Sequence, residues 1–161
     1  MNRVIFVLAS LFFMLSCSSQ KSSETTAVAE EPKENITDKM EIRHLTYNDF
    51  IKEIFNFEQS TGWSYNGDKP IIIDFYADWC QPCKQISPIL SSINEEYEGL
   101  IKVYKVNIDD EPELATACSV KSIPALIFIP MGEKEPVTSV GLIGKNDFRS
   151  IIKEVFGISR P

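Results

Sequence analysis

One stretch, residues 70–76, constrains the fold of this chain more than any other because it is apolar on both faces. Its sequence, PIIIDFY, shows no alternation of polar and apolar residues, which is typical of a strand buried between two layers. Only Asp74 interrupts the apolar run. Such a strand needs helices on both sides, so we expect an α/β domain with this strand at the centre of its sheet.

The segments around that strand alternate between strand-like and helix-like patterns. Strands are expected over residues 41–45, 70–76, 101–108, 125–129 and 137–141, and helices over residues 46–57, 80–98, 111–118 and 146–156. Thr46 and Asp49 have the spacing of a capping box at the start of the first helix, and Pro88 should kink the second. The prediction is a mixed sheet of about five strands flanked by about four helices, in one domain over residues 41–161.

The first 16 residues predict export from the cytoplasm. They combine Arg3 with an apolar run over residues 4–15, which is typical of a secretory signal and shorter than the roughly 20 residues of a membrane-spanning helix. The following MLSC (residues 14–17) resembles the bacterial lipoprotein box, and this resemblance implies that Cys17 carries lipid. The alternative, a plain secretory signal or an uncleaved anchor, also places the chain outside the cytoplasm.

Residues 18–40 are rich in Ser, Thr, Glu and Lys and predict a flexible tether, which as a random coil would span about 26 Å. The formal net charge is −7 and no basic run is present, which argues against a nucleic-acid partner. Together with the predicted signal and lipoprotein box, the tether predicts a protein that is lipid-anchored in a bacterial cell envelope, on its periplasmic or surface-facing side. We expect it to be a monomer.

The motif WCQPCK (residues 79–84) follows the buried strand, where a helix is expected to begin. Two cysteines at positions i and i+3 of a first helical turn can close a disulfide, and free backbone N–H groups there stabilise a thiolate on Cys80. Pro82 falls in the same turn, where its missing N–H breaks no helical hydrogen bond.

Other uses of the pair Cys80 and Cys83 are weaker. A purely structural disulfide across so short a loop would restrict the unfolded chain little. A zinc site would need further ligands, and the sequence offers only Cys118, His44 and scattered carboxylates. Haem attachment requires a histidine where Lys84 stands. Redox chemistry without metal or cofactor is therefore the favoured interpretation.

Several motifs together resemble the thioredoxin family over about residues 41–156. They are DFYADWCQPCK (residues 74–84), Pro88, KVNID (residues 105–109), VKSIP (residues 120–124) and Gly141. The resemblance implies a thioredoxin fold and a redox-active disulfide between Cys80 and Cys83. It further implies that Cys80 is the exposed attacking nucleophile and that Cys83 is the buried resolving thiol.

Asp74 and Lys105 are candidates for proton transfer at this dithiol. Burial in an apolar strand should raise the pKa of Asp74 and make it a proton acceptor for Cys83, and the alternative is a solvated aspartate at a strand end. Lys105 matches the family lysine that pairs with this aspartate, although a lysine on a strand faces solvent equally often.

The resemblance also implies a substrate-binding surface next to the dithiol. Its residues would be Trp79, Pro82, Ile123, Pro124 and Gly141. Pro124 matches a cis-proline that leaves the preceding backbone free to pair with an extended substrate, and Trp79 would shield one side of the dithiol or simply pack in the core. Cys118 is expected to be a buried or half-buried thiol outside the site.

The predicted function is a membrane-anchored, extracytoplasmic thiol–disulfide oxidoreductase that reduces protein disulfides. In an oxidising compartment it would be recharged by a membrane electron donor such as a transmembrane thiol transporter. Two alternatives within redox chemistry stay open, a disulfide oxidase or isomerase and a reductant for cytochrome maturation. A third is a non-enzymatic surface lipoprotein that binds a partner through Trp63 and Tyr65, in the unusually long segment 55–69.

Overall fold

The computed structural model describes residues 42–60 and 62–160, and this part of the chain is built around one five-stranded sheet. The strands lie in the order β1 (Arg43–His44), β3 (Lys102–Asn107), β2 (Ile71–Tyr76), β4 (Ala125–Ile129) and β5 (Val137–Val140). The first three are mutually parallel, whereas β4 and β5 are antiparallel to their neighbours. The expected mixed sheet is therefore confirmed.

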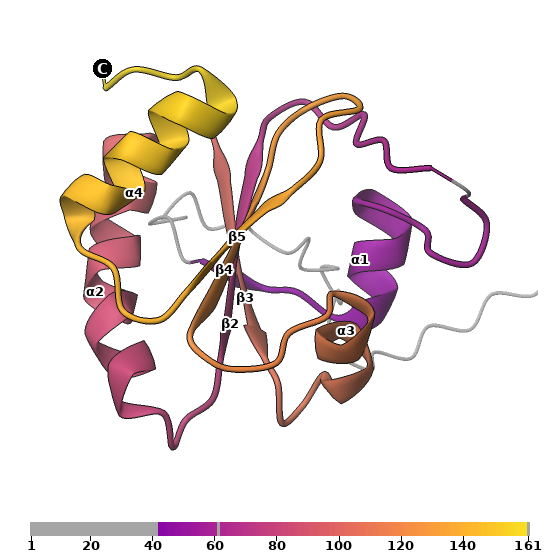
Figure 1. Cartoon of the computed structure of the whole chain (residues 1–161), viewed down its shortest axis with the longest axis horizontal. Helices are drawn as coiled ribbons and strands as arrows, with labels where there is room; N and C mark the ends of the chain where they lie inside the picture. The colour runs from indigo at the N-terminus through magenta and orange to yellow at the C-terminus, as the bar shows by residue number, and fades with distance from the viewer. Residues whose placement is uncertain (1–41, 61, 161) are drawn as a thin grey trace, which may run out of the picture. The chain divides into compact units, whose positions relative to one another are not determined.

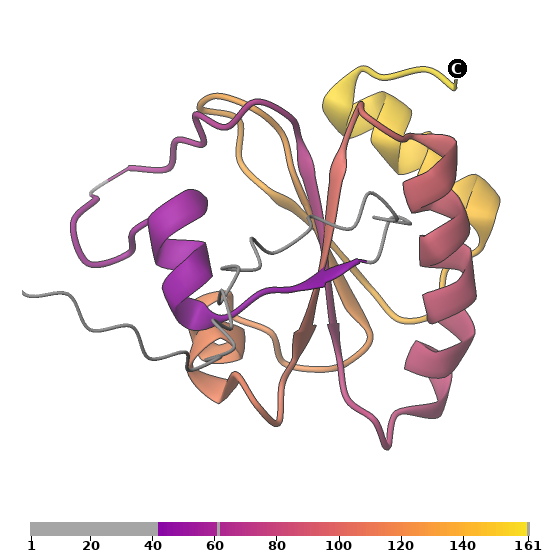
Figure 2. The ribbon, with the colours of Figure 1, turned by 180° about the vertical axis from the view of Figure 1, so that it is seen from behind.

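Helices cover both faces of the sheet. Figure 1 shows α2 (Gln81–Glu96) and α4 (Lys145–Ile151) on one face and α1 (Tyr47–Glu53) and α3 (Pro112–Ala117) on the other, and the reverse view in Figure 2 shows the same two layers. Along β2, Ile71, Ile73 and Phe75 belong to the apolar cluster under α1 and α3, and Ile72 belongs to the cluster under α2 and α4. The central strand is thus buried on both sides, as its sequence predicts.

The predicted signal over residues 1–16, the lipidated Cys17, the tether over residues 18–40 and the first residue of the domain, Glu41, lie outside the described residues. No helix within residues 42–60 and 62–160 has the length and apolar character needed to cross a bilayer.

The first helix is shorter than the sequence pattern predicts. The capping box at its start is present, with Asp49 N–H donating to Thr46 Oγ1. The helix nevertheless ends at Glu53, so the prediction that it extends to Phe57 is wrong. Phe57 reaches the core from a turn instead and stacks on Phe50 with 5.1 Å between ring centroids. Helical spacing of apolar residues shows that they are buried, but it does not show that the backbone between them is helical.

The segment 55–69 is anchored to the domain. Tyr65 is only 2% exposed, its hydroxyl donates to the carbonyl of Lys69 at 3.0 Å, and its backbone pairs with Gly132. Trp63 is half-buried and its ring lies 4.8 Å from that of Phe55. The hypothesis that Trp63 and Tyr65 form an exposed partner surface is therefore wrong for Tyr65, which is a core residue.

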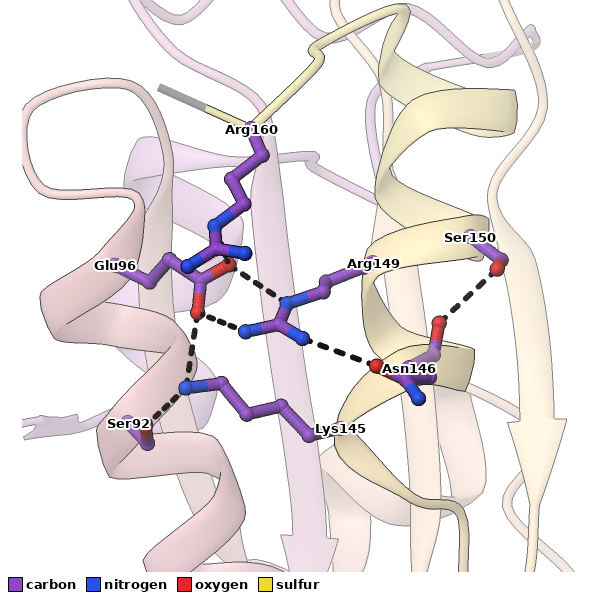
Figure 3. A network of polar contacts seen from close by, with 7 residues as sticks. All are labelled: Ser92, Glu96, Lys145, Asn146, Arg149, Ser150 and Arg160. Atoms are coloured by element: carbon purple, nitrogen blue, oxygen red, sulfur yellow. Dashed lines mark hydrogen bonds and ion pairs between the residues drawn. The ribbon is translucent and has the colours of Figure 1, made fainter.

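An ionic cluster on Glu96 joins α2 to α4 (Figure 3). Arg149 donates to both oxygens of the Glu96 carboxylate at 2.7 Å, and Lys145 Nζ lies 2.9 Å from one of them. Arg160, after the last helical turn, is 3.4 Å away. The hydrogen bonds from Arg149 and Lys145 lower the pKa of Glu96 to about 2.

The chain continues from α4 into a π-helical turn, η1 (Ile152–Phe156), with Gly157 as its C-cap.

Candidate active site

The two cysteines lie where β2 gives way to α2. Cys80 is the N-cap of α2 and Cys83 lies in its first turn, with Pro82 between them near the helix start. Their sulfur atoms are bonded, and their Cα atoms are 5.3 Å apart. The backbone N–H of Cys83 donates to Cys80 Sγ at 3.2 Å. Because free N–H groups at a helix start favour negative charge, this geometry favours a thiolate on Cys80 once the disulfide is reduced.

The predicted contrast in exposure between the two cysteines is wrong for the disulfide form. Cys80 is 4% exposed and Cys83 is 3% exposed. The pair is packed against Ala77, with Tyr76, Ile108 and Ile123 on the flanks of this cluster. Ile108 and Ile123 come from distant parts of the chain, so the sequence pattern could not show that they pack against the cysteine pair. The cysteines differ instead in their position at the helix start, where only Cys80 Sγ accepts the amide hydrogen bond described above.

Asp74 is buried in the centre of the sheet. It is fully buried, and neither carboxylate oxygen accepts a hydrogen bond from any described residue. Burial raises its pKa to about 6, and the nearby Lys105 opposes part of this shift. The alternative of a solvated aspartate at a strand end is therefore excluded.

Lys105 is brought next to Asp74 by the strand register. The two residues are cross-strand partners on β3 and β2, and Lys105 Nζ lies 3.9 Å from Asp74 Oδ2. The same ammonium donates to Ser87 Oγ of α2 at 3.1 Å, and its side chain is mostly buried. The solvent-facing alternative for Lys105 is thus excluded, because its side chain turns toward α2.

Trp79 is exposed beside the disulfide. Its side chain is 64% exposed, so the alternative of simple core packing is wrong. Its indole N–H donates to Asp109 Oδ2 at 2.9 Å. The motif KVNID contains Asp109, but the motif alone does not indicate this hydrogen bond, and sequence reasoning missed it. The signal available was an acidic residue directly after a buried strand.

A second segment of the site contains Pro124, which directly precedes β4. The Ile123–Pro124 peptide bond is cis, as the resemblance implies. The N–H of Gly141 donates to the carbonyl of Pro124 at 2.8 Å, and Gly141 has φ +94°, a conformation that favours glycine. Its neighbours Val140 and Leu142 are large exposed apolar residues, which sequence reasoning did not include. An exposed apolar surface therefore adjoins the proline loop.

The other candidate metal ligands do not form a cluster among the described residues. Within residues 42–60 and 62–160, no group of three or more His, Cys, Asp or Glu could hold a metal ion. Cys118 is a free, half-buried thiol, and burial raises its pKa to about 12. The site is thus a disulfide with a buried carboxyl, a partly buried ammonium and an apolar rim.

Comparisons with known proteins agree with this geometry. A family model described as Thioredoxin matches residues 49–154. The chain is 44% identical over 113 residues to a protein named Thioredoxin from Borreliella burgdorferi, covering 70% of this chain and 96% of that relative. Proteins of the same name from Rickettsia felis and Porphyra purpurea are each 40% identical, over 103 and 89 residues. These alignments cover 64% and 55% of this chain, and 88% and 82% of the relatives.

Proposed function

The chain belongs to the thioredoxin family and is a thiol–disulfide oxidoreductase, and on that premise we propose that it reduces protein disulfides outside the cytoplasm through Cys80 and Cys83. The observation that carries the assignment of roles is the hydrogen bond from the N–H of Cys83 to Cys80 Sγ at the start of α2. It favours a thiolate on Cys80, and the thiolate is the attacking form of a cysteine.

The proposed reaction consists of two exchanges. The Cys80 thiolate attacks one sulfur of the substrate disulfide, a bond forms between the two, and the other substrate sulfur leaves as a thiolate. Cys83 then loses its proton and attacks Cys80 Sγ, which releases the first substrate sulfur and closes the disulfide. Two electrons pass to the substrate, whose two sulfurs take up protons and become thiols.

Asp74 supports the second exchange as the acceptor of the Cys83 proton, directly or through water. A carboxyl whose pKa is about 6 is mostly ionised at neutral pH, yet it is a stronger base than an ordinary aspartate. Lys105, 3.9 Å from Asp74 Oδ2, keeps the ionised form accessible in a buried position. Loss of either side chain should slow resolution of the mixed disulfide more than its formation.

Substrate would lie over the exposed rim of the site. Trp79 is held by Asp109 at one side of the disulfide, and Ile123 packs against the cysteine pair. Pro124, Pro82 and Gly141 complete this surface in the proposal. An unfolded or extended segment with apolar residues beside its disulfide fits such a rim, because the contacts are largely apolar.

The proposed location rests on the sequence. Residues 1–16 have the composition of a secretory signal and MLSC (residues 14–17) resembles a lipoprotein box, so Cys17 would anchor the domain through residues 18–40. An oxidising compartment contains no soluble thiol reductant comparable to that of the cytoplasm, so a membrane thiol carrier would return electrons to Cys80 and Cys83.

Trapping of covalent partners tests the division of roles. In a Cys83→Ser variant, Cys80 should still attack substrate disulfides, but the mixed disulfide would persist because no resolving thiol remains. Covalent partners should then appear on non-reducing gels and disappear on reduction. The matched Cys80→Ser variant should trap few partners, since Cys83 lacks the amide hydrogen bond that favours a thiolate.

Three results decide the proposal. Equal trapping by the two single variants, or trapping by neither, would reject the roles assigned to the cysteines. Reduction of insulin disulfides by the full chain with dithiothreitol as electron source should be lost in the Cys80→Ser, Cys83→Ser double variant. Normal turnover by that double variant would reject the assigned dithiol.

A further inference from the structure

Three side chains contact the ammonium of Lys105, and of these only Asp74 takes part in the mechanism above. Asp74 Oδ2 lies at 3.9 Å and Ser87 Oγ at 3.1 Å. The third contact is the ring of Tyr76, whose centroid lies 4.3 Å from Lys105 Nζ. This distance is well within the range of about 6 Å over which a cation is attracted to an aromatic face.

The position of Tyr76 follows from the strand pattern. It lies two residues after Asp74 on β2, so both side chains project from the same face of the sheet. Lys105 on β3 is the cross-strand partner of Asp74 on one side and of His44 on the other. The ring of His44 meets that of Tyr76 edge to face at 5.9 Å. Tyr76 is therefore fixed between the edge strand and the lysine.

We propose that Tyr76 is a positioning residue that holds the Lys105 ammonium against the Asp74 carboxyl and thereby sets the pH range in which Asp74 can accept the proton of Cys83. The inference rests on the proposed function, since it concerns the proton acceptor of that reaction. Tyr76 also packs against the buried cluster of Ala77, Cys80 and Cys83, but the role assigned to it acts through Lys105 and includes no step at the sulfur atoms.

The charges around the two groups are compatible with this role. Burial is the largest influence on Asp74, and Lys105 is the charged residue that opposes it. Burial and the carboxylates of Asp78, Asp110 and Asp74 raise the pKa of the Tyr76 phenol. Tyr76 therefore stays neutral at physiological pH, so its aromatic face rather than a phenolate charge attracts Lys105.

Removal of the ring should release the lysine. Lys105 has a flexible four-carbon stem, and without an aromatic face above Nζ its ammonium can move toward water, away from Asp74. The stabilisation of the ionised carboxyl would weaken. In a Tyr76→Leu variant we expect the titration midpoint of Asp74 to rise by about 0.5 pH unit, with the acidic limb of the disulfide-reduction profile shifted equally.

The measurement is a carbon-13 NMR titration of the Asp74 carboxyl in the full chain with its disulfide intact, together with the pH profile of insulin reduction. Tyr76→Phe keeps the ring and should leave the midpoint within about 0.2 pH unit of the parent value. Lys105→Met should raise the midpoint at least as far as Tyr76→Leu does. The double variant should match Lys105→Met alone, because both changes remove the same interaction.

A matched control is Tyr104→Leu. Tyr104 is also a strand tyrosine whose ring contacts a cation: the guanidinium carbon of Arg43 lies 5.1 Å from its ring centroid. It precedes Lys105 on β3 and so faces the opposite layer. Its loss should leave the Asp74 midpoint unchanged. If Tyr76→Leu does not fold, Tyr76→Val removes the ring with a residue that favours strands.

Three outcomes would overturn the inference: an unchanged midpoint in Tyr76→Leu, a further shift when that change is added to Lys105→Met, or an equal shift in Tyr104→Leu. The proposed function would fail differently, because the parent chain itself would then not reduce insulin. The NMR titration would still measure the effect of Tyr76 on Asp74 in that case.

Discussion

Replacement of Asp74 by asparagine should make the folded protein more stable at neutral and alkaline pH, because it removes a buried charge. The pKa of Asp74 rises from 3.8 to about 6 on folding. At 1.36 kcal/mol for each pH unit, this shift corresponds to a destabilisation of about 3 kcal/mol when the carboxyl is ionised. Asp74 is fully buried, so solvent screens little of this cost.

The sign of the pH dependence follows from the raised pKa. Well below pH 3.8 the carboxyl is protonated in both the folded and the unfolded chain, and the cost is absent. It grows between pH 3.8 and about 6 and is complete above that range. The stability difference between Asp74→Asn and the parent should therefore widen by about 3 kcal/mol from pH 3.5 to pH 8.

Urea unfolding of the full chain with its disulfide intact, at pH 3.5 and pH 8, measures this difference. Asp68→Asn is the matched control, since the ion pair with Lys102 lowers the pKa of the exposed Asp68. That variant should show no gain at pH 8. A difference between Asp74→Asn and the parent that stays constant between the two pH values would refute the argument from burial.

Three further predictions concern the anchor and the packing of the domain. Glu96→Gln should lower the free energy of unfolding by about 1–2 kcal/mol at pH 7 in thermal melts, because it breaks a charge cluster that is only partly shielded from water. This loss should shrink as the pH falls from 4.5 toward 2, where the parent carboxylate is itself protonated. Gly67→Ala should cost about 1–3 kcal/mol in urea unfolding, because the added Cβ would overlap the hydroxyl of buried Tyr65; an unchanged midpoint would contradict this packing. Cys17→Ser should move the protein from the membrane to the soluble fraction without changing insulin reduction, and a lipid label that persists in this variant would contradict lipidation.

The sheet and the dithiol could be predicted because their signals are local. The apolar run of β2 identifies a strand buried on both faces, and WCQPCK places the cysteines at a helix start. The helix end at Glu53 was not predictable in the same way, because Phe57 has helical spacing yet reaches the core from a turn.

Other features depend on contacts between distant residues. The pattern of its own strand could not place Lys105 beside Asp74, and the strand register that pairs the two residues does so. Tyr65 is a core residue through its pairing with Gly132, which is far away in the sequence. The burial of Cys80 likewise depends on Ile108 and Ile123. A single sequence carries no direct record of such pairings.

The high pKa of Cys118 has a consequence for chemical selectivity. With a pKa of about 12, only about one molecule in 10⁵ carries a Cys118 thiolate at pH 7. Cys118 is therefore a poor competitor for a mixed disulfide formed at Cys80, and off-pathway cross-links between the two should be rare. Three cysteines lie in the described domain. After reduction, only Cys80 and Cys83 should react appreciably with electrophiles and disulfides.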